Sequence, residues 1–355
     1  MRQPVHGGNL AWAAALAGCP ASAILDFSAS ISPLGPPNST LSAIMSQLGN
    51  LRHYPNPDYS ELRLALSHFH QVPSEWILPG NGSAELLTLA GKEFAELAAT
   101  VLVTPAFGDY YRALTAYDAK ILEFPLSFHS GQLSLNLDKG QKTKDKGLLL
   151  NNPHNPTGKL FSRTAILPYL DEFALVLVDE AFMDFLPPEE EQSLISMVQE
   201  YPNLVILRSL TKFYSLPGLR LGYAIAQSDR LRRWQGWRDP WAVNTLAAAA
   251  AVAALDDREF QQQTWAWLAP TRNELFSGLA SLEGLQPLES TANFLLVESQ
   301  RSCSLLQQKL LQHHQILIRD CQSFPELGDR FFRVAVRSKS DNQRLLEALN
   351  SVLQS

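Results

Sequence analysis

The stretch SLTKFYSLPGLRLGY, residues 209–223, is the part of the sequence that decides the fold. It contains a lysine in a segment where an ordinary solvated surface charge is not expected. Lys212 follows the hydroxyl residues Ser209 and Thr211, and Arg220 comes eight residues after it. Apolar runs lie on both sides of this segment, as expected for a loop between buried strands. The rest of the sequence must therefore explain why a lysine lies among hydroxyls and a second cation.

Composition restricts the class of protein before any motif is considered. The chain has 355 residues, nearly half of them hydrophobic, and a formal net charge of -6. That predicts a globular protein with a sizeable core, and it argues against nucleic-acid binding, which needs a basic surface. Three scattered cysteines show no metal or disulfide spacing, so we expect no metal and a cytoplasmic location.

An apolar stretch near the start of the chain has two interpretations. Residues 7–19 end in Leu-Ala-Gly-Cys, which resembles a lipoprotein cleavage site before Cys19. Only Arg2 is positive ahead of it, however, and Asn9 interrupts its start. We favour a short Ala-rich helix, and the Ala run at 246–255 is too short to span a bilayer. The sequence therefore predicts no membrane association.

Apolar runs alternate with helix-like segments over the first two thirds of the chain. Runs of this kind occupy 100–104, 147–152, 174–181, 203–209 and 221–226. Strands that are apolar on both faces predict an α/β fold with a mainly parallel sheet. Beyond it we expect helix over 242–280 and 302–314, strands at 292–299, 315–320 and 330–337, and a final helix at 341–353. We place a large domain at 36–245, and a small α+β domain with an N-terminal arm at 1–35 and 246–355.

Five motifs in the large domain lie where a predicted strand gives way to a loop. They are PGNGSAELL (79–87), PAFGDYY (105–111), NNPHNPTG (151–158), LVDEAF (177–182) and the opening stretch. Taken singly, each has a plain structural interpretation: a turn, a core aromatic, a helix cap or a solvated charge. Loops beyond strand carboxyl ends nevertheless gather at one edge of such a sheet, where ligands bind.

Together the motifs meet the requirements of pyridoxal phosphate. Lys212 supplies the amine for the cofactor's aldehyde, and Asp179 keeps the ring nitrogen protonated. Phe107 stacks on the ring and Asn155 donates a hydrogen bond to its phenolic oxygen. Lys212 and Asp179 are the predicted catalytic residues. The predicted phosphate ligands are Asn81, Gly82, Ser83, Ser209, Thr211 and Arg220.

The motifs at 151–158, 177–182 and 209–223 resemble the signatures of fold-type I pyridoxal-phosphate enzymes, the class that includes histidinol-phosphate aminotransferases. The resemblance covers essentially the whole chain. It implies the aspartate aminotransferase fold, with a seven-stranded, mainly parallel sheet in the large domain. It also implies a homodimer with shared active sites, in which Tyr54 of HYPNPDY (53–59) reaches the partner's cofactor phosphate.

The ends of the chain are similar to the threonine-phosphate decarboxylases of cobalamin biosynthesis, a group within this class. The similarity lies in HGGN (6–9), LDFSASISPLGP (25–36) and LIRDCQSFPELGDRFFRVAVR (317–337). It implies a phosphorylated amino acid as substrate, with Arg319 on its phosphate and Arg333 on its carboxylate. The other implied substrate contacts are His6, Gly7, Ser30 and Asn155. We interpret Arg337 as structural.

Two departures from the group leave alternatives open. Ser30 and Ser32 stand where the group carries asparagine, and Phe182 stands where related aminotransferases often carry a tyrosine. The sequence does not show which bond of the substrate breaks. An aminotransferase acting on histidinol phosphate is therefore the alternative, and a noncatalytic binding or regulatory protein of this fold is the second.

Overall fold

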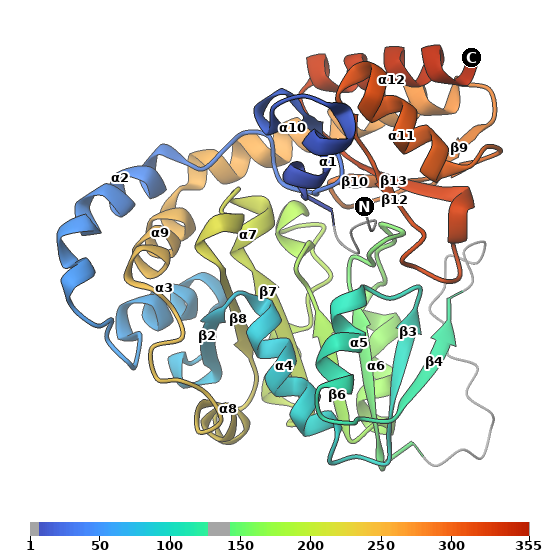
Figure 1. The fold of residues 1–355 in the computed structure, drawn as a ribbon. Coiled ribbons are helices and arrows are strands. Elements are labelled where there is room, and N and C mark those ends of the chain that lie inside the picture. Colours follow the sequence, from blue (N-terminus) through green and yellow to red (C-terminus); the bar gives the residue numbers. More distant parts are fainter. Residues whose placement is uncertain (1–6, 127–142, 355) are drawn as a thin grey trace.

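The computed structural model describes residues 7–126 and 143–354, and a seven-stranded sheet forms its centre (Figure 1). The strand order is β2-β8-β7-β6-β5-β3-β4. β8 runs antiparallel to both neighbours, and the other pairs are parallel, which confirms the predicted α/β class. The bounds are β2 (Ile77–Asn81), β3 (Ala99–Thr104), β4 (Ile121–Pro125), β5 (Lys146–Asn151), β6 (Leu175–Asp179), β7 (Leu204–Ser209) and β8 (Leu221–Ile225).

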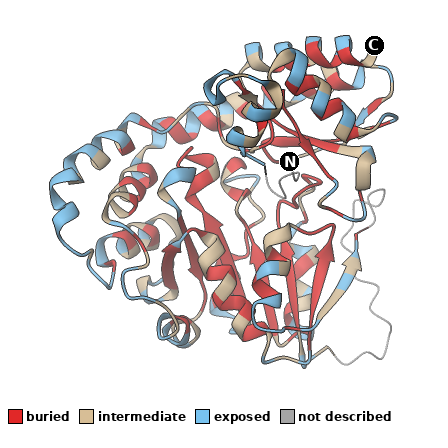
Figure 2. Ribbon diagram, viewed as in Figure 1, coloured by how far each residue is buried: buried red, intermediate tan, exposed pale blue. Residues whose placement is uncertain are grey.

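Helices cover both faces of this sheet, and the central strands are buried (Figure 2). Alternate residues of one strand enter different cores because side chains in a strand point to opposite faces. In β6, Leu177 packs with α4 (Ser83–Phe94) and α5 (Gly108–Thr115), whereas Val178 joins the core that contains α6 (Arg163–Glu172). A continuous apolar run in the sequence is the direct result of this two-sided burial.

A second, four-stranded antiparallel sheet, in the order β12-β13-β10-β9, forms the centre of the smaller part. Helices α10 (Arg258–Ala280), α11 (Cys303–His314) and α12 (Lys339–Gln354) accompany it (Figure 1). Its strands are β9 (Leu285–Pro287), β10 (Phe294–Ser299), β12 (Arg319–Asp320) and β13 (Phe331–Ala335). In the register of β12 and β13, Arg319 lies directly opposite Arg333.

Two elements differ in detail from the sequence-based expectation. The expected strand at 315–320 is split: β11 (Ile316–Leu317) pairs in parallel with β1 (Leu25–Asp26), and β12 belongs to the four-stranded sheet. The expected helix over 242–280 is two helices, α9 (Thr245–Asp256) and α10. Asp257 separates them, because its backbone is not helical and its side chain accepts a hydrogen bond from the Phe260 N–H, as an N-cap does.

The N-terminal apolar stretch is helical, as the sequence predicts. It forms α1 (Leu10–Ala17), which ends at Gly18 in the left-handed conformation and contacts α11 of the smaller part. Next come α2 (Asn38–Gln47), which projects from the body in Figure 1, and α3 (Ser60–His70). None of the helices in the described ranges combines the length and the apolar character needed to cross a bilayer. The domain boundaries at 35/36 and 245/246 stay a prediction; the second coincides with the start of α9.

Candidate active site

A cavity of about 420 Å³ opens at the edge of the large sheet where the parallel strands end. Asn151, Asp179 and Ser209 come from the carboxyl ends of β5, β6 and β7. The opposite wall comes from the smaller part and from the N-terminal segment. Other residues that line the cavity include Gly7, Ser28, Ser30, Gly82, Ser83, Phe107, Tyr110, Asn155, Phe182, Thr211, Lys212, Arg220, Arg319, Ser323, Phe324 and Arg333.

One end of this cavity is a site for an anion. Gly82 is the N-cap of α4, and Gly82, Ser83 and Ala84 line the cavity, so the first turn of this helix borders it. The N–H groups of a first helical turn have no partner within the helix and can bind an anion. Gly82 has φ +75°, and a Cβ there would approach Arg220 Nη2 to 2.5 Å, so glycine allows the guanidinium to come close. The hydroxyls of Ser209 and Thr211, 2.8 Å apart, lie on the same wall. This arrangement fits a phosphate group.

Lys212 lies in α7 (Leu210–Phe213), which directly follows β7. Burial lowers the pKa of its amine to about 8, and the positive charges of Arg333 and Arg220 act in the same direction. Asp179 opposes them only in part. A larger share of the amine is therefore uncharged near neutral pH than in an exposed lysine, and the uncharged form is the nucleophile.

Asp179 is a buried carboxyl whose two oxygens already accept hydrogen bonds. Burial raises its pKa to about 6, while the hydrogen bonds and the Lys212 charge hold the pKa down. The Tyr110 hydroxyl donates to Oδ2 at 2.8 Å, and the Ala181 N–H donates to Oδ1 at 3.1 Å. The carboxylate keeps further lone pairs for a ligand in the cavity. An acid held in this way suits a protonated ring nitrogen.

The substrate wall is built around Arg333, which is 8% exposed. Its Nη1 donates to Asn155 Oδ1, and its Nη2 donates to the Ser28 carbonyl at 3.2 Å. Its Nε has no hydrogen-bond partner in the described part of the chain. Burial lowers the pKa of the guanidinium to about 10. The bond from Arg333 fixes the side-chain amide of Asn155 so that its Nδ2 remains available as a donor.

Arg319 lies beside Arg333 and is also nearly buried, at 6% exposure. Its Nη2 donates to Ser323 Oγ, and its Nη1 lies 3.7 Å from Asp320 Oδ1. Burial lowers the pKa of this guanidinium as well. Ser30 faces the same cavity, and its buried hydroxyl has no partner among the described residues. The wall therefore holds two cations and an unsatisfied hydroxyl, which suits an anionic ligand.

Other predicted site residues lie away from the cavity or outside the described part. Asn81 ends β2 with an exposed side chain, and its N–H donates to Glu85 Oε2 at 2.7 Å. Tyr54 is 78% exposed, and its ring lies 4.5 Å from that of Trp241. His6 lies outside the described residues. Arg337, interpreted as structural, bonds Asp341 Oδ2 at 3.1 Å and the Asp26 carbonyl.

Several residues of the cavity were not singled out from the sequence. Tyr110 stands in the same motif as Phe107, three residues later, and the two rings meet edge to face at 5.7 Å. A spacing of three at a helix start puts two side chains on one face, so this signal was present in the sequence. Ser28 and Ser323 lay in quoted motifs, but only the folded chain shows that they contact the two arginines.

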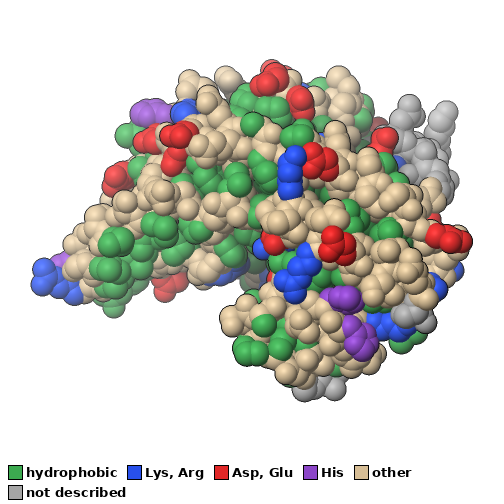
Figure 3. Space-filling view, turned by 90° about the horizontal axis from the view of Figure 1, so that it is seen from above, with side chains coloured by type: hydrophobic (Ala, Val, Ile, Leu, Met, Phe, Trp, Pro, Cys, Tyr) green, Lys and Arg blue, Asp and Glu red, His purple; other side chains and the backbone are tan. Residues whose placement is uncertain are grey.

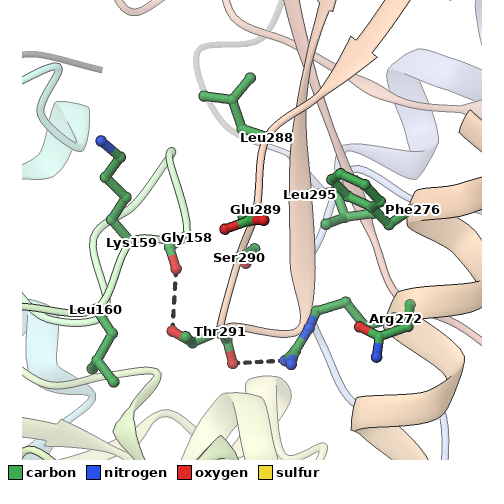
Figure 4. A pocket seen from close by; sticks show the side chains of 11 residues that line it. Gly158, Lys159, Leu160, Arg272, Phe276, Leu288, Glu289, Ser290, Thr291 and Leu295 are labelled. Carbon is green, nitrogen blue, oxygen red and sulfur yellow. Dashed lines mark hydrogen bonds between the residues drawn. The ribbon is translucent and has the colours of Figure 1, made fainter. Parts of the chain in front are cut away.

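A second cavity, of about 700 Å³, lies where the 158–160 loop meets the smaller part (Figure 4). None of the predicted site residues lines it. Its main feature is a contact between the two parts: the Thr291 N–H and hydroxyl donate to the Gly158 carbonyl at 2.9 and 3.1 Å. Arg272 Nη1 donates to the Thr291 carbonyl at 2.9 Å. Because the cation, the acid and the anion site gather in the smaller cavity, we assign the chemistry there.

Comparisons with known proteins agree with this geometry. Residues 22–349 match the family described as "Aminotransferase class I and II". The chain is 40% identical to a threonine-phosphate decarboxylase of Salmonella typhimurium, over 98% of this chain and 96% of that protein. It is 29% identical to an adenosylcobalamin biosynthesis bifunctional protein of Leptospira interrogans, over 99% of this chain and 41% of that protein. The structure of L-threonine-O-3-phosphate decarboxylase from Porphyromonas gingivalis superposes with a TM-score of 0.82 and 26% identity, over 93% of this chain and 99% of that one.

Proposed function

The chain belongs to the aminotransferase class I and II family, and on that premise we propose that it is a pyridoxal-phosphate-dependent decarboxylase. Its substrate is L-threonine O-3-phosphate, and its products are (R)-1-amino-2-propanol O-2-phosphate and CO2. The reaction serves cobalamin biosynthesis, in keeping with the Leptospira relative. The similarity to the Salmonella decarboxylase over nearly the full length supports this choice.

One observation of the site carries the proposal: Arg319 and Arg333 lie directly opposite each other on neighbouring strands, and both are buried. Like charges in cross-strand register destabilise a sheet. Asp320 lies beside Arg319, whereas Arg333 donates hydrogen bonds to the neutral Asn155 side chain and the Ser28 carbonyl. A substrate that carries both a phosphate and a carboxylate supplies two anionic groups to this pair. Arg220 remains at the α4 end for the cofactor's own phosphate.

The cofactor, when bound, supplies a protonated ring that withdraws electrons from the bond that breaks at the substrate's α-carbon. Asp179 holds the proton on the ring nitrogen, and the ring of Phe107 faces the cavity from the end of the loop after β3. Arg319 binds the substrate phosphate and Arg333 its carboxylate, so the substrate is oriented from two points.

Lys212 is also placed to take part in proton transfer. After CO2 leaves, the α-carbon takes up a proton, for which Lys212 Nζ and a water are the candidate donors. An amine with a pKa of about 8 can hold this proton and also release it near neutral pH. Phe182, on the same cavity, packs edge to face on Phe294 at 5.1 Å and offers no hydroxyl to the ring oxygen.

Product analysis tests the proposal directly. Purified protein loaded with pyridoxal phosphate is incubated with phosphothreonine alone, and separately with histidinol phosphate plus 2-oxoglutarate. CO2 and aminopropanol phosphate without any keto acid support decarboxylation. Glutamate formation in the second mixture would identify a histidinol-phosphate aminotransferase instead. Bound cofactor without either reaction would favour a noncatalytic role.

We further propose that the enzyme is a homodimer. The support is an apolar patch on α2 and the segment after it, comprising Leu41, Met45, Leu48 and Leu51, each at least 44% exposed. Figure 3 shows hydrophobic side chains along the projecting arm. Monomers seldom expose apolar surface in this way, and a second copy is the partner that the family resemblance implies. Tyr54 follows this patch and is 78% exposed despite its contact with Trp241, so its side chain is accessible to the other subunit.

We also propose a cytoplasmic location. The three cysteines, Cys19, Cys303 and Cys321, are all free thiols. Cys19 directly follows Gly18, which ends α1, so the stretch before it is used as a packed helix. The intact mass of the protein tests this: a chain shortened and acylated at Cys19 would contradict it, and would also remove Gly7 from the cavity.

A further inference from the structure

Resting on the proposed use of pyridoxal phosphate, we infer that Tyr110 is a positioning residue that holds Asp179 ionised and correctly oriented for the cofactor's ring nitrogen. The hydroxyl of Tyr110 donates to Asp179 Oδ2 at 2.8 Å. Tyr110 is 2% exposed and comes from α5, whereas Asp179 ends β6. The contact thus joins a helix on the face of the sheet to the acid at its edge.

In the hydrogen bond between Tyr110 and Asp179, the donor and the acceptor can be assigned. An ionised carboxylate only accepts hydrogen bonds, so the tyrosine is the donor. Burial and the negative charge of Asp179 raise the pKa of Tyr110 well above its usual value, which keeps the proton on the phenol. The Tyr110 bond in turn lowers the pKa of Asp179 against the effect of burial. Without it, Asp179 would take up a proton at higher pH.

Protonation of Asp179 matters because only the ionised carboxylate can accept a hydrogen bond from the protonated ring nitrogen and balance its charge. Among the described residues, the groups that act on the pKa of Asp179 besides burial are Tyr110 and Asp109 from α5, Lys212 from α7, and the Ala181 N–H. Asp109 raises the pKa of Asp179, and Lys212 lowers it. Attachment of the cofactor to Lys212 changes the charge of that lysine, whereas the Tyr110–Asp179 bond does not involve Lys212. Tyr110 is therefore the side-chain donor that keeps the acid ionised in both states.

The packing of Tyr110 gives it a second function. Its ring meets the ring of Phe107 edge to face at 5.7 Å, with an interplanar angle of 88°. Phe107 is the residue predicted to stack on the cofactor, and it is the N-cap of α5. One tyrosine therefore supports both the acid that faces the ring nitrogen and the aromatic side chain at the ring face.

The neighbouring tyrosine offers a matched control. Tyr111 lies on the same helix, and its hydroxyl also donates to a carboxylate, Glu123 Oε1, at 2.6 Å. Tyr111 and Glu123 do not line the cavity. Tyr110→Phe and Tyr111→Phe therefore remove the same group and the same kind of bond, one at the site and one outside it.

The test measures cofactor affinity rather than turnover. Cofactor-stripped full-length protein is dialysed to equilibrium against pyridoxal phosphate, at one pH near the Asp179 pKa of about 6 and at one near the Lys212 pKa of about 8. Tyr110→Phe should bind about tenfold more weakly, with the greater loss at the lower pH. Tyr111→Phe should stay within about twofold of the unchanged protein at both.

A double-mutant cycle separates positioning from plain structural support. In an Asp179→Asn background, the added Tyr110→Phe change should alter cofactor affinity little, because there is no charge left to maintain. An equal loss in both backgrounds, or no loss at all in Tyr110→Phe, would overturn the inference. If Tyr110→Phe fails to fold, Tyr110→Gln and Tyr110→Leu replace it, and the glutamine variant, which retains a donor, must bind more tightly. No cofactor binding by the unchanged protein would instead refute the proposed function.

Discussion

At the residue scale, Lys212 shows how a protein prepares an amine for chemistry. Burial, together with the charges of Arg333 and Arg220, lowers its pKa to about 8, and Asp179 offsets only part of this effect. The same arginines are the proposed sites for the cofactor phosphate and the substrate carboxylate. One arrangement of cations thus binds the anionic groups and lowers the charge of the nucleophile.

The Lys212 substitution is the first test of the site. Lys212→Ala removes the amine that joins the cofactor, so the visible absorbance band of the bound cofactor should disappear and decarboxylation should fall by at least about a thousandfold. Lys159→Ala is a suitable control, because that lysine lines the other cavity. A band that survives Lys212→Ala would mean that another residue carries the cofactor.

The pH dependence of cofactor attachment tests the electrostatics. Only the uncharged amine reacts, so the rate of attachment should rise as pH passes through the Lys212 pKa of about 8. Arg333 lowers this pKa, so Arg333→Met should raise the pKa and move the rise to higher pH. Stopped-flow absorbance over a pH series measures both curves. A shift to lower pH would contradict the assigned sign. Arg333→Met should also lower the rate of decarboxylation by at least about tenfold, because the substrate carboxylate loses the arginine proposed to bind it.

The sequence indicated that residues in motifs at strand ends would lie close together. Lys212, Asp179 and Asn155 line one cavity, as their positions after three parallel strands led us to expect. Tyr110 and Ser28 were not predicted as site residues, because tyrosine and serine have many structural uses. Their partners, Asp179 and Arg333, are 69 and 305 residues away in the sequence. Such pairs depend on how the sheet is assembled, and no local pattern encodes that.

At the element scale, the N-terminus of α4 is the part of the site most dependent on backbone shape. Gly82 lies at φ +75° between β2 and the helix. Its position brings the first helical N–H groups and the Arg220 guanidinium to the same place. A side chain there would clash with the arginine and would strain the turn as well.

Gly82→Ala should therefore weaken cofactor binding by about tenfold or more, because the phosphate loses its cation and the helix start shifts. Gly218→Ala is the matched control, since a Cβ at Gly218 meets nothing within 4 Å. Equilibrium dialysis against pyridoxal phosphate compares the two. Equal affinities would show that the α4 terminus is not the phosphate site.

The apolar runs predicted which strands exist more accurately than they predicted where each strand begins and ends. Strands β3, β5, β6, β7 and β8 were predicted because each is buried on both faces, which leaves an uninterrupted hydrophobic signal. The two edge strands, β2 and the partly exposed β4, were not predicted. The division of 315–320 between two sheets was missed because Ile318, between the short strands, is as apolar as they are. The break at Asp257 carried a readable signal, an aspartate three residues before Phe260 at the start of a helix.

At the scale of the whole molecule, the active site lies between parts that are far apart in the chain. Lys212 and Asp179 come from the large sheet, and Arg319 and Arg333 come from the small one. The bonds Arg333–Asn155 and Thr291–Gly158 both reach the same turn, so the two parts are joined at two points beside the site. The general α/β layout was predictable from the alternation of strands and helices, but this junction was not.

The proposed dimer gives a prediction at this scale. Met45→Glu combined with Leu48→Glu puts two charges on the apolar patch, so analytical ultracentrifugation should show a shift toward a 39.4 kDa monomer. Cofactor retention should fall by about tenfold, because Tyr54 would lose its place at the partner's site. Leu305→Glu is the control, a comparably exposed leucine on α11. A monomeric unchanged protein would refute the dimer.

The pairing of β1 with β11 has a consequence for how the molecule is made. Leu25 and Asp26 find their strand partners in Ile316 and Leu317, close to the other end of the sequence. During synthesis on the ribosome, β1 can therefore pair with β11 only after nearly the whole polypeptide has emerged. Because Ser28 lies two residues beyond that strand and bonds Arg333, the substrate wall is among the last parts to assemble. A chain that ends before Phe331 therefore lacks both Arg333 and the strand that places it beside Ser28.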